Sequence, residues 1–393
     1  MKTPILYLSH SANLYGSEQS LLLLIQGLNK KQFSPIVVLP TDGPLRQLLE
    51  PHAKVEIVPS LQPWLTWRRG FWCLVYNIII IPFILWSIFS LIKIIKKHKV
   101  ELIHTNSLVM IDGALAAKIM QIPHVWHARE LLSATSLYPI HSVFGRRQVI
   151  AIIQNLSSFI IANSDATLAC FPGFSLITTI YNPVSEAFLA ATPNKTKIYT
   201  EFKLASNILL IGQAGHITSL KGYDDFITAA AIIKKSMPHV HFFIAGSTPK
   251  SGRVYEKKLR QMIIEYNLQE TVHLVGYRTD IVSFMSALDV FVLASHSESF
   301  GRALVEASAI GIPVIGTNVG GIPEIVEHGV TGFIVPPYQP EKLAKAILLI
   351  LKDPKLAHQM GQAGKAYVKQ KFSSTAYISQ ITALYEQFIP IKG

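Results

Sequence analysis

The amino-acid sequence predicts an α/β fold with two domains, each built around a mainly parallel sheet. Its 393 residues exceed what one ordinary hydrophobic core holds, and half of them are hydrophobic, so two domains can each bury a core. Short apolar runs without polar alternation recur along the chain and alternate with helical patterns. Such runs are typical of strands buried on both faces, joined by helices that form right-handed crossovers.

The expected strands fall into two groups, one in each half of the chain. Polar and helix-breaking residues separate the groups near 190–206, which predicts a first domain of residues 1–190 and a second of residues 191–375. The apolar runs expected to be strands are Ile5–Leu8, Ile36–Leu39, Val55–Val58, Leu102–His104, Val125–His127, Phe159–Ala162, Thr179–Tyr181, Ile208–Ile211, His241–Ala245, Val272–Val275, Val290–Leu293, Val314–Ile315 and Phe333–Val335.

The last part of the chain, Pro340–Phe388, shows consecutive helical patterns and no apolar run of the strand type. A terminal helix that serves no strand of its own domain can pack on another domain. We therefore expect residues 376–393 to form a C-terminal helix that crosses back to the first domain.

Charge and cysteine content limit the classes of partner and compartment. The formal net charge of +12 favours an anionic partner, such as a diphosphate substrate or an anionic lipid. Lys and Arg are scattered and no nucleic-acid-binding motif is present, so nucleic acid is not an expected partner. The two cysteines, Cys73 and Cys170, lack disulfide or metal-ligand spacing, which argues for a reducing compartment and against a zinc site. The apolar run Ile5–Leu8 is too short for a signal peptide, so we expect a cytoplasmic protein.

One stretch, Phe71–Ile92, carries no charge and is long enough to span a bilayer. A span would separate strands that must join one sheet, and the basic residues at both ends give no positive-inside asymmetry. Pro82 at its midpoint would kink a straight helix. We therefore expect a helix, or a kinked helical hairpin, that dips into one leaflet and holds the protein peripherally on the inner face of the cytoplasmic membrane. A long core helix and a full span are the alternatives.

Basic residues lie on both sides of this stretch, and aromatic residues lie before and within it. The basic residues are Arg68, Arg69, Lys93, Lys96, Lys97 and Lys99. The aromatic residues, which resemble a set at a membrane interface, are Trp64, Trp67, Phe71, Trp72 and Trp86.

The strongest candidate site follows the expected strand Val290–Leu293. Ligands of open α/β sheets lie at the carboxyl ends of strands, where helix N-termini present unpaired N–H groups. Here Glu298 lies in a loop and Ser299 is a good cap residue for a helix that would hold Glu306 roughly 10–12 Å further on. That separation suits a sugar nucleotide, with one carboxylate near the sugar and the other on the ribose diol. The alternative is a solvated helix on which Glu298 and Glu306 are merely exposed, since it would show the same spacing.

A glycine loop that contains Gly215 and His216 follows another expected strand and precedes Lys221. Such a loop can cradle an anion, with Lys221 as a point charge on a diphosphate. Lone Gly–Lys pairs are also common at protein surfaces.

Two further candidates follow strands of the first half. Gly16 opens a helix and would let backbone amides approach a phosphate or an acceptor, but Gly16-Ser17-Glu18 is also an ordinary helix start. His127 ends a strand just ahead of Arg129-Glu130. It is a better site candidate than a histidine on an apolar face, although a lone histidine is usually structural.

Taken in order, these segments resemble the group 1 retaining glycosyltransferases, family 4 of the sequence classification, which have the GT-B fold. The most specific part is the E-x7-E signature from Glu298 to Glu306, and the resemblance covers nearly the whole chain. It implies two Rossmann-like domains facing across a cleft, the first binding the acceptor and the second the nucleotide-sugar. The other matching segments are Ile180–Val184, Lys221-Gly222, Phe243–Gly246, His273–Arg278, Ala309–Ile315 and Gly320–Glu324.

The resemblance implies catalytic roles for His127, Lys221 and Glu298. His127 would lie beside the sugar near the anomeric carbon, Lys221 would neutralise the diphosphate leaving group, and Glu298 would meet the donor sugar. Glu306 would hold the ribose hydroxyls. The expected donor-binding residues are Gly16, Gly215, His216, Lys221, Tyr277, Arg278, Glu298, Ser299, Phe300, Gly301, Arg302 and Glu306.

Two positions depart from the family pattern. His216 stands where the family usually has arginine, so Arg302 or a protonated His216 would have to supply the second phosphate cation. The first loop has Tyr15-Gly16 in place of a glycine pair, which leaves less room for a close backbone approach.

The resemblance further implies retention at the anomeric carbon by a front-face substitution, with no metal and no cofactor, because cationic side chains and helix N-termini stabilise the departing diphosphate. The acceptor is expected to be a glycan or a lipid-linked molecule in cell-surface polysaccharide or glycolipid synthesis. A nucleotide-sugar 2-epimerase of the same architecture and an inactive membrane-bound assembly subunit remain as alternatives.

Overall fold

The computed structural model describes residues 2–65, 71–132 and 145–389. Its contacts divide the chain into two compact units, Met1–Pro183 with Ser374–Gly393, and Val184–Ser373. The first unit ends before the expected boundary at residue 190, because the short helix α7 (Glu186–Ala190) packs on α12 (Arg302–Ile310) of the second unit.

The first unit contains a seven-stranded parallel sheet in the order β3-β2-β1-β4-β5-β6-β7. Each strand expected in this half of the sequence is present, although β7 lies slightly ahead of the apolar run that predicted it. The strands are β1 (Thr3–Leu8), β2 (Phe33–Leu39), β3 (Lys54–Ile57), β4 (Leu102–Thr105), β5 (His124–Ala128), β6 (Phe159–Ala162) and β7 (Ile177–Thr179).

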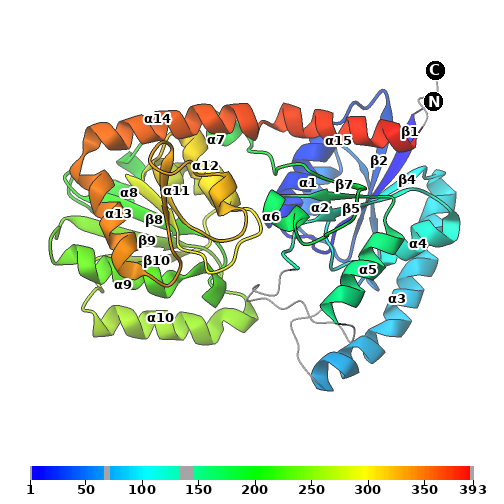
Figure 1. The fold of residues 1–393 in the computed structure, drawn as a ribbon, viewed down its shortest axis with the longest axis horizontal. Coiled ribbons are helices and arrows are strands. Elements are labelled where there is room, and N and C mark those ends of the chain that lie inside the picture. The colour runs from blue at the N-terminus through cyan, green and yellow to red at the C-terminus, as the bar shows by residue number, and fades with distance from the viewer. Residues whose placement is uncertain (1, 66–70, 133–144, 390–393) are drawn as a thin grey trace. The chain divides into compact units, whose positions relative to one another are not determined.

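Helices cover both faces of this sheet, which explains why its strands lack polar alternation. Ile5 and Tyr7 of β1 lie in a core with α1, α2 and α15, whereas Leu6 and Leu8 face a second core with α3 and α4. Successive side chains of a strand point to opposite faces, so both sets must be apolar. The helices of this unit are α1 (Gly16–Gly27), α2 (Pro44–Leu49), α3 (Phe71–His98), α4 (Asp112–Met120), α5 (Arg146–Leu156), α6 (Asp165–Leu168) and α15 (Ser374–Phe388) (Figure 1).

The last helix, α15, belongs to the first unit although it ends the chain. It packs on α1, and Tyr377, Ile381 and Tyr385 are buried in the same core as β1. Its start at Ser374 lies close to the boundary expected at residue 376, and residues 390–393 lie outside the described part of the chain.

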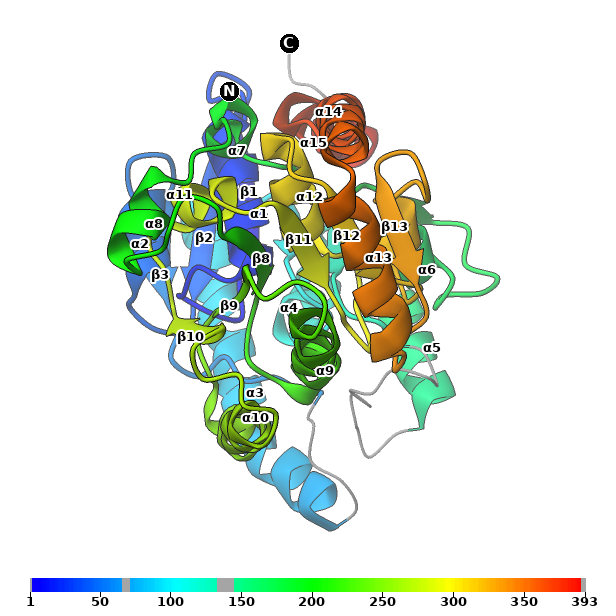
Figure 2. The ribbon, with the colours of Figure 1, turned by 90° about the vertical axis from the view of Figure 1, so that its left-hand side faces the viewer.

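The second unit contains a six-stranded parallel sheet in the order β10-β9-β8-β11-β12-β13. Helices α9, α10 and α13 bury apolar side chains with those of β8, β9 and β11 in one core, and α9 and α13 pack on each other (Figure 2). The strands are β8 (Leu209–Ala214), β9 (Val240–Ala245), β10 (Val272–Gly276), β11 (Val290–Leu293), β12 (Val314–Thr317) and β13 (Gly332–Val335).

The further helices of this unit are α8 (Thr196–Glu201), α9 (Tyr223–Lys234), α10 (Arg253–Glu265), α11 (Ile281–Ser286), α13 (Pro340–Lys352) and α14 (Pro354–Lys371). Helices α13 and α14, followed by α15, confirm the expected run of helices after Pro340.

The uncharged stretch forms one continuous helix, α3, that runs through Pro82, so the expected alternative of a kinked helical hairpin is wrong. In its most apolar window only 28% of residues are buried, so α3 is not a core helix of this chain. Among the described residues, α3 is the helix whose length and composition would allow it to cross a membrane. Its exposed apolar residues are Phe71, Trp72, Leu74, Ile78, Ile79, Ile81, Phe83, Leu85, Trp86 and Phe89.

One face of α3 packs on the rest of the first unit, and the sequence did not predict which face this is. Ile80, Leu91 and Ile95 are buried, and the Ser87 hydroxyl donates to the carboxylate of Asp112 at the start of α4. Trp64, expected at a membrane interface, is instead buried, and its indole N–H donates to the Leu108 carbonyl at 2.9 Å. Trp67, Arg68 and Arg69 lie outside the described residues.

Candidate functional site

The loop after β11 carries Glu298 and leads into α12. The helix begins at Arg302, not at Ser299 as the cap preference predicted. Gly301 precedes it with φ +108°, a left-handed conformation that only glycine adopts readily and that delays the helix. The buried ring of Phe300 packs on Phe372 at 5.6 Å between ring centroids and fixes the loop from inside.

Lys221 and Glu298 meet although 77 residues separate them in sequence. Lys221 ends a short 3₁₀ turn after β8, and its ammonium group forms an ion pair with the Glu298 carboxylate. The two loops come together at Gly222, where a Cβ atom would lie 1.9 Å from the Ala294 carbonyl oxygen. Glycine is therefore required beside Lys221, both for this approach and for its φ of +59°.

Glu306 lies in α12 and is buried, with 8% of its surface exposed. Its carboxylate accepts a hydrogen bond of 2.7 Å from Nε of Arg302, one turn earlier on the same helix. Arg302 therefore has a carboxylate partner of its own, which limits its use as the second phosphate cation.

The glycine loop after β8 lies against the end of β9. Gly215 has φ +148°, and a Cβ on Gly246 would lie 1.8 Å from the Gly215 carbonyl oxygen. His216 follows with its Nδ1 3.1 Å from the Ser247 hydroxyl. Burial lowers the pKa of His216, and the charge of Lys221 lowers it further. Both effects favour the neutral ring, so this structure opposes a protonated His216 as the missing cation.

Tyr277 and Arg278 follow β10. Tyr277 is exposed, whereas the Arg278 guanidinium binds Glu201 at 2.6 and 2.8 Å and Asp280 at 2.7 and 2.8 Å. The hydrogen bonds that Arg278 donates to these carboxylates raise its pKa. The Arg278 side chain thus ties α8 to the start of α11.

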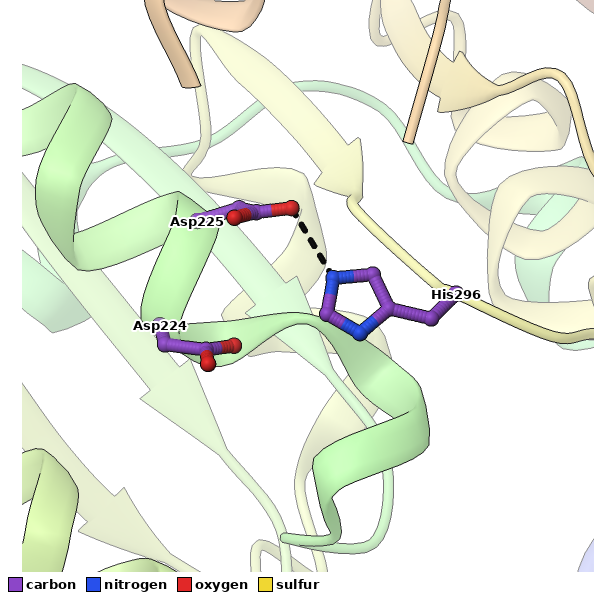
Figure 3. A group of neighbouring side chains, drawn as sticks. All are labelled: Asp224, Asp225 and His296. Atoms are coloured by element: carbon purple, nitrogen blue, oxygen red, sulfur yellow. Dashed lines mark hydrogen bonds and ion pairs between the residues drawn. The ribbon is translucent and has the colours of Figure 1, made fainter. Parts of the chain in front are cut away.

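A tie that sequence reasoning missed holds the loop after β11 to the first turn of α9. Nε2 of His296 lies 2.9 Å from a carboxylate oxygen of Asp225 (Figure 3). The His296 ring also stacks on Tyr338. Asp225 also accepts from the Tyr338 backbone N–H at 3.0 Å. The neighbouring Asp224 accepts from the hydroxyl of Tyr255 at 2.7 Å and pairs with Lys258 at 3.0 Å, so its partners belong to α10.

These three side chains could each offer a metal-ligand atom, and those atoms lie within 4.8 Å of one another. Each already has the protein partners described above, which account for the cluster as a structural tie. Since His296 lies two residues before Glu298, the tie fixes the segment that carries this carboxylate.

In the first unit, Gly16 is the first residue of α1, as expected, and Glu18 is fully buried in its first turn. The Glu18 carboxylate accepts from the hydroxyls of Ser9 at 3.1 Å and Ser17 at 2.7 Å, and lies 3.3 Å from Nδ1 of His10. The burial of Glu18 was not predicted, because an acidic residue in a first turn is usually exposed.

His127 lies in β5 near its carboxyl end and is fully buried. Two residues later, Arg129 donates to the side-chain oxygens of Asn106 and Asn182 and to the Tyr377 hydroxyl. Glu130 accepts from the hydroxyl of Ser107 and from the backbone N–H groups of Leu108 and Arg129. The charged pair after His127 was the signal in the sequence, but its partners come from distant segments.

Two family models match this chain, one in each half. Residues 15–188 match the model for Glycosyltransferase Family 4, and residues 195–367 match the model for Glycosyl transferases group 1. The chain belongs to the group 1 glycosyltransferases. The E-x7-E segment of this glycosyltransferase family member lies within the second match.

Curated relatives match part of this family member. The N-acetyl-alpha-D-glucosaminyl L-malate synthase of Bacillus anthracis is 27% identical over 209 residues, which cover 53% of each chain. The capsular polysaccharide biosynthesis glycosyltransferase CapM of Staphylococcus aureus is 31% identical over 187 residues, which cover 48% of each chain. The chain spans about half the length of the curated relatives it matches.

A solved structure matches over nearly the full length. The Anabaena protein Alr3699/HepE, in complex with UDP and glucose, is 26% identical with a TM-score of 0.81, over 98% of this chain and 100% of that chain. This likeness and the two parallel-sheet units give the chain the GT-B fold that the sequence predicted.

Proposed function

We propose that this chain transfers a sugar from a nucleotide-diphospho-sugar to a glycan or lipid-linked acceptor, with retention at the anomeric carbon. The observation that carries the proposal is the Lys221–Glu298 pair at the carboxyl ends of β8 and β11, next to the helix that holds Glu306. A cation for a diphosphate and two carboxylates for hydroxyl groups are the groups that such a donor needs.

The proposed reaction is a front-face substitution. The acceptor oxygen bonds to the anomeric carbon as the bond to the diphosphate oxygen breaks, and that departing oxygen takes the acceptor proton. Lys221 and the N–H groups at the start of α12 stabilise the diphosphate, Glu298 and the amides of Phe300 and Gly301 hold the sugar, and Glu306 holds the ribose diol. The proposal assigns no cofactor or metal to this step.

The relatives support a choice of donor and pathway to test first. The Anabaena protein was solved with UDP and with UDP-glucose, which favours a UDP-sugar for this chain. The name of CapM refers to capsular polysaccharide biosynthesis, which supports the synthesis of a cell-surface polysaccharide or glycolipid.

We also propose that the protein attaches peripherally to the inner face of the cytoplasmic membrane through α3. The exposed apolar residues of this helix form a surface that water solvates poorly, and Lys93, Lys96 and Lys97 follow it on the same helix. Apolar side chains followed by lysines suit one leaflet of an anionic bilayer. Such attachment would bring the enzyme to a lipid-linked acceptor.

Replacing Glu306 with glutamine is expected to weaken the binding of UDP and of UDP-sugar by about 1–3 kcal/mol, the contribution of a charge-assisted hydrogen bond. Titration calorimetry on the wild-type and variant proteins measures the difference. Glu341→Gln, an equal charge change at an exposed residue of α13, is the control and should leave the affinity unchanged. An unchanged affinity of Glu306→Gln would remove this residue from the ribose site.

A further inference from the structure

His296 belongs to the loop that carries Glu298 and is bonded to the loop that carries Lys221. Its backbone N–H donates to the carbonyl of Leu220 at 2.7 Å, and Leu220 directly precedes Lys221. Glu298 follows His296 by two residues. The His296 side chain is only 6% exposed and lies against Gly222, where a Cβ atom would come within 3.1 Å of Nε2. A change in the position of His296 would therefore move both members of the Lys221–Glu298 pair.

Two neighbours hold the His296 ring in place. Nε2 lies 2.9 Å from a carboxylate oxygen of Asp225, in the first turn of α9 (Figure 3). One face of the ring stacks on Tyr338, in the loop after β13, with 3.8 Å between ring centroids and 28° between ring planes. The same Asp225 oxygen accepts from the Tyr338 backbone N–H at 3.0 Å. Each of the three residues thus contacts the other two, and we call the set His296, Asp225 and Tyr338 the His296 clamp.

Tyr338 has a backbone conformation that few residues other than glycine adopt. Its φ is +58°, in the left-handed region that a Cβ atom disfavours. Tyr338 is 57% exposed, so burial in a core does not hold it there. Backbone conformations of this kind persist where surrounding contacts enforce them, and they cluster at functional sites. At Tyr338 the enforcing contacts are the hydrogen bond to Asp225 and the stack on His296.

The separation of the two loops decides whether the Lys221–Glu298 pair forms. Lys221 ends a 3₁₀ turn ahead of α9, and Glu298 lies in the loop ahead of α12, so the distance between them depends on how these loops pack. The His296 clamp joins the loops through the first turn of α9. Because a displacement of about 1 Å at a reacting group can lower a rate by roughly 100-fold, a small change in loop separation would reach the leaving-group step.

We propose that His296 is a positioning residue: the His296 clamp sets the geometry of the Lys221–Glu298 pair and thereby the turnover of sugar transfer. The effect on turnover rests on the proposed function, whereas the effect on geometry does not. His296 acts through the two loops and needs no contact with the donor. Its effect is expected in kcat more than in the apparent donor constant, because the charge of Lys221 contributes most as the diphosphate departs.

Steady-state kinetics on the full-length protein test the effect on turnover. His296→Ala is expected to lower kcat by roughly 10- to 100-fold, with a much smaller change in the apparent donor constant. His328→Ala is the control, because it removes an exposed histidine of the same unit that also contacts an aromatic ring, Phe333, and it should leave kcat unchanged. An unchanged kcat in His296→Ala, or an equal loss in His328→Ala, overturns the proposal.

A double-mutant cycle separates positioning from a general defect of the fold. His296 acts through a pair that Lys221→Ala already removes, so adding His296→Ala to Lys221→Ala is expected to lower kcat little further. A merely structural defect would lower kcat by the same factor in both backgrounds. That result overturns the positioning role.

Tyr338 supplies a second test, which also applies if His296→Ala does not fold. Tyr338→Gly removes the ring, and glycine adopts a φ of +58° without strain, so the backbone can keep its conformation. Loss of the stack should lower kcat by about 2- to 10-fold, the scale of one aromatic contact. Tyr338→Phe keeps the ring and should retain most of the wild-type kcat. Equal kcat values for these two variants overturn the role of the clamp.

Crystal structures let the two proposals fail separately, because they show the Lys221–Glu298 pair without an assay of transfer. The pair is expected to be intact in the wild type and separated in His296→Ala, or in Tyr338→Gly if the first variant does not fold. That result supports the His296 clamp even if the wild-type protein transfers no sugar, which would remove only the proposed function. An intact pair in the variant overturns the clamp, whatever the activity.

Discussion

Replacing Lys221 with alanine is expected to lower kcat by roughly 100- to 1,000-fold, the usual effect of removing one group that stabilises a developing oxyanion, while the apparent donor constant changes much less. Negative charge grows on the diphosphate as the bond to the anomeric carbon breaks, so the ammonium group contributes most in the transition state. Steady-state kinetics that vary the donor measure both constants. A rise in the donor constant with unchanged kcat would contradict the role of Lys221 in the leaving-group step.

Two control variants make the Lys221 result specific. Lys258→Ala removes a lysine of the same unit that also pairs with a carboxylate, Asp224, and should leave kcat unchanged. Lys221→Ala strands the Glu298 carboxylate, of which only 13% is exposed, and this alone could disturb the site. Lys221→Ala combined with Glu298→Gln removes both charges, and kcat should remain low. Recovery of kcat in the double variant would show that the stranded carboxylate caused the defect.

Replacing Trp72, Ile79 and Trp86 with serine is expected to move the protein from the membrane fraction to the soluble fraction. These three side chains are 66%, 56% and 67% exposed, and each apolar side chain buried in lipid gains about 1.5–3 kcal/mol. Lysine contacts with anionic lipid contribute only about 1 kcal/mol each. High salt should therefore release the wild-type protein poorly, and detergent should release it well.

The fractionation needs a control for exposed apolar side chains in general. Val254 and Ile264 of α10 are 84% and 54% exposed, and their replacement with serine should leave the distribution unchanged. Ile80 is unsuitable for the test because it is buried and its loss would destabilise the first unit. Wild-type protein that is soluble after lysis without detergent would contradict the membrane proposal.

The sequence predicted the two sheets well because strands buried on both faces leave uninterrupted apolar runs such as Ile5–Leu8. It predicted the start of α12 poorly because Ser299 is a favourable cap, whereas the left-handed conformation of Gly301 that delays the helix depends on packing around the loop. The burial of Ile80 also could not be predicted, because the uncharged part of α3 is apolar on all sides and nothing in its pattern shows which face meets α4. Trp64 lies before α3, and its contact with the distant Leu108 carbonyl forms only in the folded chain.

The candidate site, like the fold, could be predicted from the sequence only in part. The E-x7-E spacing located Glu298 and Glu306, and the glycine loop located Lys221, because these signals lie within short segments. The surroundings of His127 could not be predicted, since Asn106, Asn182 and Tyr377 reach Arg129 only after β4, β7 and α15 have packed together. The preference of His216 for its neutral form depends likewise on burial, which a sequence position does not reveal.

The central claim is that the chain moves the sugar of a nucleotide donor onto an acceptor. The direct measurement is the ratio of labelled sugar joined to acceptor to nucleotide diphosphate released, in a mixture of the protein, a panel of labelled UDP-, GDP- and ADP-sugars, and an extract of membrane lipids and glycans. The account predicts a ratio close to one with a UDP-sugar, and loss of both products in Lys221→Ala. Nucleotide diphosphate released while the label stays on free sugar, as a 2-epimerase would produce, contradicts it, and so does the absence of release from every donor, as expected of an inactive assembly subunit.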